Sequence, residues 1–299
     1  MTATVPSPGF RCGHVAIVGR PNVGKSTLLN RLVGEKVSIT SSKAQTTRHR
    51  VTGILTTATA QFVFVDTPGF QTKHRSALNA RMNRSVTQSL VGVDAVILVV
   101  EAGRTTDADR AVVALLPRDA HVVAALNKID TLADKGALLP QIGALAAAYP
   151  FAAIVPVSAE KGKDLDRLAA AVEPLLPVGP AMYGADELTD RDERFLAAEF
   201  VREKIFRLLG EEVPYATTVA VEKFEHDGRL RRIFAVIYVD RDSQKGILLG
   251  EGGRKMKEIG TKARLDMERL FGGPVFLDLH VRVKEGWADD ERALRRFGY

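Results

Sequence analysis

The segment Gly19–Ser26 constrains the fold of this chain more than any other feature. It begins at the last residue of an apolar run, residues 15–19 (Val-Ala-Ile-Val-Gly), which is typical of a buried parallel strand. It fits the pattern G-x-x-x-x-G-K-[ST], and Leu28, Leu29 and Leu32 follow it at helical spacing. Strand, loop and helix in that order predict a phosphate-binding loop, because glycines let backbone N–H groups turn toward phosphate oxygens and the helix N-terminus adds partial positive charge.

Two side chains at the end of this loop carry groups that can bind a nucleotide, an amine and a hydroxyl. We expect Lys25 to reach the β- and γ-phosphates and Ser26 to coordinate Mg²⁺. The alternative is a Gly-rich turn with a surface lysine, which the flanking strand and helix argue against. The predicted nucleotide contacts here are Gly19, Arg20, Pro21, Asn22, Val23, Gly24, Lys25, Ser26 and Thr27.

A second apolar run, residues 61–65, ends at Asp66. Ligands of open α/β sheets bind at the carboxyl ends of the strands, so the sequence predicts Asp66 as a Mg²⁺ ligand, direct or through water. Gly69 has no Cβ and can offer its N–H to a γ-phosphate. The polar and basic residues 71–85 are then expected to be a mobile segment that loss of this phosphate releases. The predicted contacts are Asp66, Thr67, Pro68, Gly69 and Phe70.

Two adjacent threonines, Thr46 and Thr47, lie between these motifs. One of the two hydroxyls is expected to complete the Mg²⁺ shell when the γ-phosphate is present, and the sequence does not say which. A Ser/Thr-rich stretch is otherwise a solvated loop, and only its position between the two motifs favours a ligand. The predicted catalytic residues are Lys25, Thr46, Thr47 and Gly69.

The residue after Gly69 affects the expected rate at which the bound nucleotide is hydrolysed. Many small GTPases have Gln there to orient the attacking water, whereas this chain has Phe70, which cannot hydrogen-bond water. Hydrolysis must then rely on another group, on water and metal alone, or on a partner, and we expect slow intrinsic turnover. Gln71, one residue later, is a weaker candidate for this role.

The segment Asn127–Asp130 follows a third buried-strand run, residues 122–126. In Asn-x-x-Asp, the carboxylate of Asp130 can accept hydrogen bonds from guanine N1–H and the exocyclic amine. Adenine lacks both donors, and the unpaired carboxylate would cost on the order of a few kcal/mol. The predicted base contacts are Asn127, Lys128, Ile129 and Asp130, with Ser158 and Ala159 at the end of a further strand, and the predicted ligands are therefore GTP and GDP with Mg²⁺.

Composition limits the classes of protein to which this chain can belong. The 299 residues are 45% apolar, enough for one or two cores, and no apolar run approaches the roughly 18 residues that span a membrane. No signal peptide is visible. Cys12 is the only cysteine, which excludes an internal disulfide and suits a reducing, cytoplasmic location. The net charge of +6 permits nucleic acid or an anionic membrane as partner.

Two domains are predicted. Strand–helix alternation over residues 12–178 indicates an α/β domain with a mainly parallel sheet. Prolines and glycines mark a linker over residues 179–189. Residues 190–299 read as helix, strand, strand, helix, helix, strand, a smaller α+β domain. The charge excess is +5 in residues 1–189 and +1 in the remainder, so an RNA site in the second domain must come from local arrangement.

A Gly-x-x-Gly turn lies between the two later helices. In a KH fold such a turn presses its backbone against single-stranded RNA. A flexible helix–helix turn is the alternative, and the frame of helices and strands around it favours RNA binding. Glu251 is unfavourable because an acidic side chain opposes phosphate. The predicted RNA contacts are Gly250, Glu251, Gly252, Gly253, Arg254, Lys255 and Lys257.

Taken together, these motifs resemble the bacterial Era GTPase family, a Ras-like P-loop GTPase domain joined to a KH domain of the second topological type. The resemblance covers nearly the whole chain, and its segments include Lys43–Arg50, Leu249–Gly260 and the tail Gly286–Arg295. It implies binding of the KH domain to the 3′ end of 16S ribosomal RNA, a role in 30S subunit assembly and maturation, and peripheral contact with the inner membrane. Separately, we expect the chain to be a monomer. Glu251 departs from the family, in which neutral or positive residues are common.

Two other functions compete with a GTP-hydrolysing assembly factor. In the first, the chain is an RNA-binding scaffold in which the nucleotide is structural, and Phe70 favours this alternative. In the second, it is a membrane-associated cell-cycle GTPase, against which stands the lack of a lipidation motif or a strongly basic amphipathic helix.

Overall fold

The computed structural model describes residues 9–70, 76–210 and 212–299, which form two compact units. The first unit comprises residues 9–38, 47–70 and 82–190. The second comprises residues 39–46, 76–81, 191–210 and 212–299. The chain passes from one unit to the other between Thr46 and Thr47, so the two threonines singled out in the sequence belong to different units.

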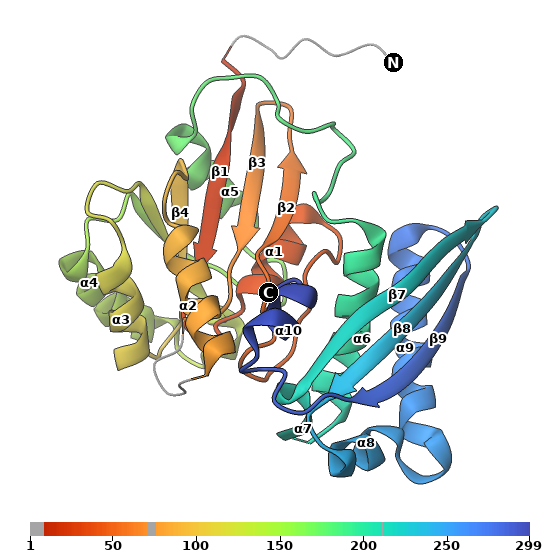
Figure 1. Cartoon of the computed structure of the whole chain (residues 1–299). Coiled ribbons are helices and arrows are strands. Elements are labelled where there is room, and N and C mark those ends of the chain that lie inside the picture. The colour runs from red at the N-terminus through yellow and green to blue at the C-terminus, as the bar shows by residue number, and fades with distance from the viewer. Residues whose placement is uncertain (1–8, 71–75, 211) are drawn as a thin grey trace. The chain divides into compact units, whose positions relative to one another are not determined.

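The first unit is built on a six-stranded sheet in the order β2-β3-β1-β4-β5-β6 (Figure 1). All neighbouring strands are parallel except β2 and β3, as expected for a mainly parallel sheet. The strands are β1 (Arg11–Val18), β2 (Val51–Thr56), β3 (Ala60–Asp66), β4 (Ala95–Glu101), β5 (Val122–Asn127) and β6 (Ala153–Pro156). The helices are α1 (Lys25–Val33), α3 (Asp107–Leu115), α4 (Leu138–Ala148) and α5 (Leu165–Val172), with α2 (Ala77–Gln88) crossing the boundary between the units.

Helices cover both faces of this sheet. Side chains of α2, α3 and α4, among them Val86, Val112 and Leu145, share one apolar cluster with β1, β4 and β5. On the other face, α1 packs against β2 and β3, and α5 packs against β5 and β6. With both faces covered, β3 and β5 are buried along their whole length, which explains why they read as continuous apolar runs.

The parallel register places polar side chains at one edge of the sheet. Ile17 of β1 pairs with Asp66 of β3, and Glu101 of β4 pairs with Asn127 of β5. The phosphate loop leaves β1 at the same edge. Carboxyl ends of neighbouring parallel strands meet there, which is where open α/β sheets bind ligands.

Residues 179–189 contain no helix or strand and are hydrogen-bonded to β2 and β3 of the same unit. Gln61 Oε1 accepts hydrogen bonds from the N–H groups of Met182 and Tyr183, at 2.8 and 2.9 Å. The N–H of Ile54 donates to the carbonyl of Leu188 at 2.9 Å. Backbone groups of this segment are therefore paired with a side chain of β3 and a backbone N–H of β2 in place of regular secondary structure.

The second unit is a three-stranded sheet, β7-β8-β9, with two long helices packed against one of its faces (Figure 1). β7 and β8 are antiparallel, and β8 and β9 are parallel. The predicted order of elements is confirmed, with the short helices α7 and α10 in addition. The elements are α6 (Glu193–Leu208), α7 (Glu212–Tyr215), β7 (Thr217–Asp227), β8 (Leu230–Val239), α8 (Asp242–Leu249), α9 (Arg254–Phe271), β9 (Val275–Val283) and α10 (Glu291–Arg296).

Helices α6 and α9 supply most of the core of this unit. Phe200 and Ile205 of α6 pack with Ile259 and Met267 of α9 in a single cluster that also holds the inner faces of the strands. Helix α6 begins where Asp192 accepts a hydrogen bond from the N–H of Phe195, a side-chain cap at 2.7 Å. The helix is buried over Glu199–Phe206, including three consecutive charged residues.

The tail after β9 closes the unit. Trp287 is fully buried, and its Nε1 donates to the carbonyl of Ala216 at 2.9 Å. Its ring contacts those of Phe297 and Tyr299, with centroids 5.8 and 6.0 Å away. Among the described residues, no helix combines the length and the apolar content needed to cross a bilayer.

Truncating the core of the second unit should destabilise it measurably. We expect Phe200→Ala to lower its free energy of unfolding by about 3–5 kcal/mol, because Phe200 is buried and a cavity would remain. Urea unfolding followed by the fluorescence of Trp287, the only tryptophan, reports on this unit. Phe276→Ala is the control, because Phe276 is 44% exposed, and an equal loss in both variants would contradict the assignment of the core.

Candidate functional site

The phosphate loop Gly19–Ser26 connects β1 to α1 as predicted. Gly24 caps α1 in the left-handed region, with φ of 97°, and a Cβ there would collide with Asn127 Nδ2. The buried amine of Lys25 donates to the carbonyls of Gly19 and Arg20 at 3.1 and 3.0 Å, so it lies against the backbone of the phosphate loop. Burial lowers the pKa of Lys25 to about 8, although the charge of Asp66 opposes the shift.

Four oxygen-bearing side chains converge beside this lysine. Ser26 Oγ donates to Asp66 Oδ2 at 2.7 Å, and Ser38 Oγ donates to the same oxygen at 2.9 Å. Thr47 Oγ1 lies 2.8 Å from Ser26 Oγ and 3.4 Å from Asp66 Oδ2. The other oxygen of Asp66, Oδ1, is buried and accepts no hydrogen bond from the described part of the chain.

This arrangement fits a magnesium ion. Mg²⁺ prefers oxygen ligands and is usually held by one or two carboxylates, with water and substrate phosphates completing the shell. A buried carboxylate oxygen without a hydrogen bond is costly unless a cation or water satisfies it. Burial raises the pKa of Asp66, while the charge of Lys25 and the three hydroxyls act in the opposite direction.

The two adjacent threonines have different surroundings. Thr47 contacts Ser26 and Asp66 as described. The hydroxyl of Thr46 donates instead to the carbonyl of Lys43 at 2.7 Å and lies 2.8 Å from Ser41 Oγ. The geometry therefore places the Thr47 hydroxyl, and not that of Thr46, among the magnesium candidates.

Gly69 approaches the phosphate loop closely. A Cβ at this position would lie 2.8 Å from the Cα and the N of Pro21, so only glycine fits without a backbone shift. Phe70 is partly buried against the apolar core of the first unit, where its ring has no polar function. Gln71 lies outside the described residues. Of the segment expected to be mobile, residues 77–85 form part of α2.

Asn127 connects the phosphate loop with the predicted base-binding segments. Its Nδ2 donates to the carbonyl of Val23 at 2.8 Å, and its Oδ1 accepts from the N–H of Ala159 at 2.9 Å. Ser158 Oγ donates to Asp130 Oδ1 at 2.5 Å. These contacts bring together the two predicted base-binding segments, Asn127–Asp130 and Ser158–Ala159.

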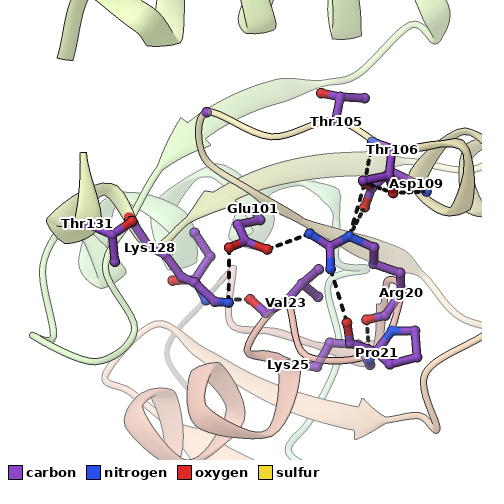
Figure 2. A network of polar contacts seen from close by, with 12 residues as sticks. Arg20, Pro21, Val23, Lys25, Glu101, Thr105, Thr106, Asp109, Lys128 and Thr131 are labelled. Atoms are coloured by element: carbon purple, nitrogen blue, oxygen red, sulfur yellow. Dashed lines mark hydrogen bonds and ion pairs between the residues drawn. The ribbon is translucent and has the colours of Figure 1, made fainter. Parts of the chain in front are cut away.

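The sequence analysis did not identify two acidic residues near this edge, Glu101 and Asp109. Glu101 ends β4, and its carboxylate lies 2.5 Å from Arg20 Nη2 and 3.4 Å from Lys128 Nζ (Figure 2). Asp109 of α3 lies 3.1 Å from Arg20 Nε. Burial raises the pKa of Glu101, but Arg20 and Lys128 outweigh that effect and hold the pKa below its ordinary value. Glu101 follows an apolar run as Asp66 and Asn127 do, and this signal could have identified it.

Residues 39–46 are held by charged side chains of α6 within the second unit. Arg202 is 1% exposed and donates to Glu199 Oε1 at 2.7 Å and to the carbonyl of Thr46 at 2.5 Å. Glu203 Oε1 accepts from the N–H of Thr40 at 2.9 Å. No sequence signal marked these residues, because charges on a helix normally face solvent.

The Gly-x-x-Gly turn joins α8 to α9 as predicted. Gly250, Gly252 and Gly253 all have positive φ, at 67, 58 and 75°. Glu251 forms an ion pair with Arg254 in the exposed turn, so its charge is partly neutralised within the loop. Lys255 pairs with Glu258 at 3.1 Å, and Arg254 and Lys257 line a shallow depression beside α9.

Comparison with known families agrees with this two-part organisation. Residues 14–128 match a family described as 50S ribosome-binding GTPase, and residues 212–288 match the KH domain family. The KH match lies within the second unit, and the GTPase match lies in the first unit except for residues 39–46 and 76–81.

Similar proteins of known family cover almost the whole chain. GTPase Era of Chromobacterium violaceum is 57% identical over 97% of this chain and 98% of its own length. GTPase Era of Nitrosomonas eutropha is 54% identical over 97% of this chain and 98% of its own length.

Solved structures give the same result. A point variant of Aquifex aeolicus Era bound to GDP·AlF4⁻ is 38% identical and superposes with a TM-score of 0.93, covering 97% of this chain and 99% of that one. A structure of Era in complex with MgGDPNP and nucleotides 1506–1542 of 16S ribosomal RNA matches with the same identity, TM-score and coverage. On sequence, domain content and fold, the chain belongs to the Era family of GTPases.

Proposed function

We propose that this chain binds GTP and GDP with Mg²⁺ at the edge of the first sheet, hydrolyses GTP, and binds the 3′ end of 16S ribosomal RNA through the turn between α8 and α9. Its role is assembly and maturation of the small ribosomal subunit in the cytoplasm. The observation that carries the proposal is the convergence of Ser26, Thr47 and Asp66 beside Lys25, with one buried carboxylate oxygen left for a cation. The Era structure solved with MgGDPNP and 16S ribosomal RNA supports both ligands.

In the phosphate subsite, Lys25 would neutralise charge on the β- and γ-phosphates, and Gly69 would offer its N–H to the γ-phosphate. Ser26, Thr47 and Asp66 would hold Mg²⁺, which supplies further positive charge where negative charge develops during hydrolysis. Phe70 cannot orient the attacking water. We therefore expect slow intrinsic turnover of GTP.

In the base subsite, Asp130 would accept two hydrogen bonds from guanine. Ser158 already donates to one of its oxygens, which keeps the carboxylate in place. The side chain of Lys128 would lie over the base. The N–H of Ala159 donates to Asn127, which holds in place the loop that would face the guanine carbonyl. An adenine base would offer Asp130 neither of these two donors, so the site would favour guanine.

The two threonines give a sharp test of the magnesium site. Thr47→Ala should lower the GTP hydrolysis rate roughly 10- to 100-fold, as loss of a metal-site group commonly does. Thr46→Ala, one residue away, should keep most of the activity, because its hydroxyl contacts Ser41 and Lys43. Phosphate release is measured over a Mg²⁺ titration, with EDTA as the metal-free control. A larger loss in Thr46→Ala than in Thr47→Ala would contradict this assignment.

Coupling between nucleotide and RNA would pass through residues 39–47. Thr47 lies in the first unit beside Ser26, and the residues before it belong to the second unit, where α6 holds Thr40 and Thr46. A peptide bond joins Thr46 to Thr47. Binding of a γ-phosphate at Thr47 would therefore act on a segment that is also part of the RNA-binding unit, and the coupling must be reciprocal.

RNA affinity measured in both nucleotide states tests this proposal. A fluorescent RNA from the 3′ end of 16S ribosomal RNA should bind more tightly with a non-hydrolysable GTP analogue than with GDP, measured by anisotropy at one salt concentration. Replacing Gly252 and Gly253 by Asp should abolish this binding, because carboxylates would face the RNA phosphates. Gly228→Asp is the matched control, because Gly228 also has positive φ but lies in the β7–β8 hairpin. Equal affinity in both states would favour the scaffold function instead.

Peripheral contact with the inner membrane, which the family resemblance implies, stays a prediction. The net charge of +6 favours anionic lipid at low ionic strength. Flotation with vesicles containing phosphatidylglycerol should recover the protein at low salt and lose it as salt rises. No recovery at the lowest salt concentration would exclude this contact for the isolated chain.

A further inference from the structure

Glu101 occupies a central place in the first sheet. Strand β4 lies between β1, which leads into the phosphate loop, and β5, which leads into Asn127–Asp130. Glu101 is the last residue of β4 and pairs in register with Asn127. A side chain at this position can therefore reach both the phosphate loop and the base-binding segment.

Its carboxylate contacts a cation from each of those motifs. Oε2 lies 2.5 Å from Nη2 of Arg20 in the phosphate loop, and Oε1 lies 3.4 Å from Nζ of Lys128 (Figure 2). The two oxygens of one carboxylate thus connect the segment that faces the phosphates with the segment that faces the base.

The contacts of Glu101 with Arg20 and Lys128 form a bridge that the surrounding structure holds in place. Gln141 of α4 donates to the carbonyl of Glu101 at 3.0 Å and accepts from the N–H of Gly103 at 2.8 Å, so the end of β4 is held in place. On the other side of the Arg20 guanidinium, Asp109 lies at 3.1 Å and also forms a capping box with Thr106 at the start of α3. Arg20 is therefore paired with carboxylates from two elements, strand β4 and helix α3.

Burial separates this network from an ordinary surface ion pair. The side chains of Arg20, Asp109 and Glu101 are 12, 2 and 22% exposed. Exposed pairs contribute little because water screens them and the side chains lose entropy on pairing. Here neighbouring groups already order the side chains, and water reaches them only in part.

We propose that Glu101 is a positioning residue that holds Arg20 and Lys128 in one geometry and so slows the release of guanine nucleotide. The proposal rests on the nucleotide site described above. A bound GDP would engage both loops at once, so its release would require them to separate. A carboxylate that joins the loops favours the arrangement that binds both ends of the nucleotide, which is preorganisation of the site.

The test uses Glu101→Gln, which keeps the shape of the side chain and removes its charge. Stopped-flow release of a fluorescent GDP from the full chain should become roughly tenfold faster, while the association rate changes little. Asp107→Asn is the matched control, because this carboxylate lies in the first turn of α3, pairs with Arg110 at 2.6 Å and is 97% exposed. Its release rate should equal that of the unmodified protein.

A double-mutant cycle with Arg20→Gln shows whether Glu101 acts through the bridge. The two changes together should accelerate release by less than the product of their separate effects, because each removes the same contact. Thermal unfolding of each variant without nucleotide separates a change of site geometry from a loss of fold. Faster release with an unchanged unfolding temperature supports positioning.

Three results would overturn the proposal. Release from Glu101→Gln at the rate of the Asp107→Asn control would exclude a role in positioning. Independent effects of Arg20→Gln and Glu101→Gln would exclude the bridge. A failure of the unmodified protein to bind GDP would overturn the nucleotide site itself, and this outcome is distinguishable because it affects every variant.

Discussion

Neighbouring parallel strands end at the same edge of their sheet, and every nucleotide contact proposed for this chain depends on that constraint. The phosphate loop follows β1, and the adjacent strands β3, β4 and β5 end at Asp66, Glu101 and Asn127. A shift of one residue in register would turn each of these side chains to the opposite face. The apolar faces that helices cover therefore fix the positions of the polar residues at the edge.

Burial of charge is the second determinant of the site. Lys25 and Asp66 are buried near each other, and their charges offset part of the cost of removing each from water. Asp66 Oδ1 is buried without a hydrogen bond from the described residues, and the free-energy cost of this burial is the physical reason to expect a cation there. In the second unit, Arg202 and Glu203 are also buried, and their hydrogen bonds to the backbone of residues 39–46 satisfy part of their bonding capacity.

Much of the fold could be predicted from local patterns. The apolar runs before Gly19, Asp66 and Asn127 are strands, and the second unit contains the predicted order of helix, strand, strand, helix, helix and strand. The sequence did not identify Arg202 or Glu203, because a run of charged residues on a helix ordinarily indicates a solvent-exposed face. Glu101 could have been found by the same reasoning as Asp66, since both follow a buried strand.

By itself, the sequence determined the order of the nucleotide motifs, the two-domain organisation and the helix–turn–helix frame of the Gly-x-x-Gly turn, because these depend on patterns within short segments. Only the tertiary structure distinguished Thr47 from Thr46 beside Ser26 and placed Glu101 between Arg20 and Lys128. Such contacts join residues that are far apart in the chain. They depend on strand order and register, which periodicity in a single segment does not encode.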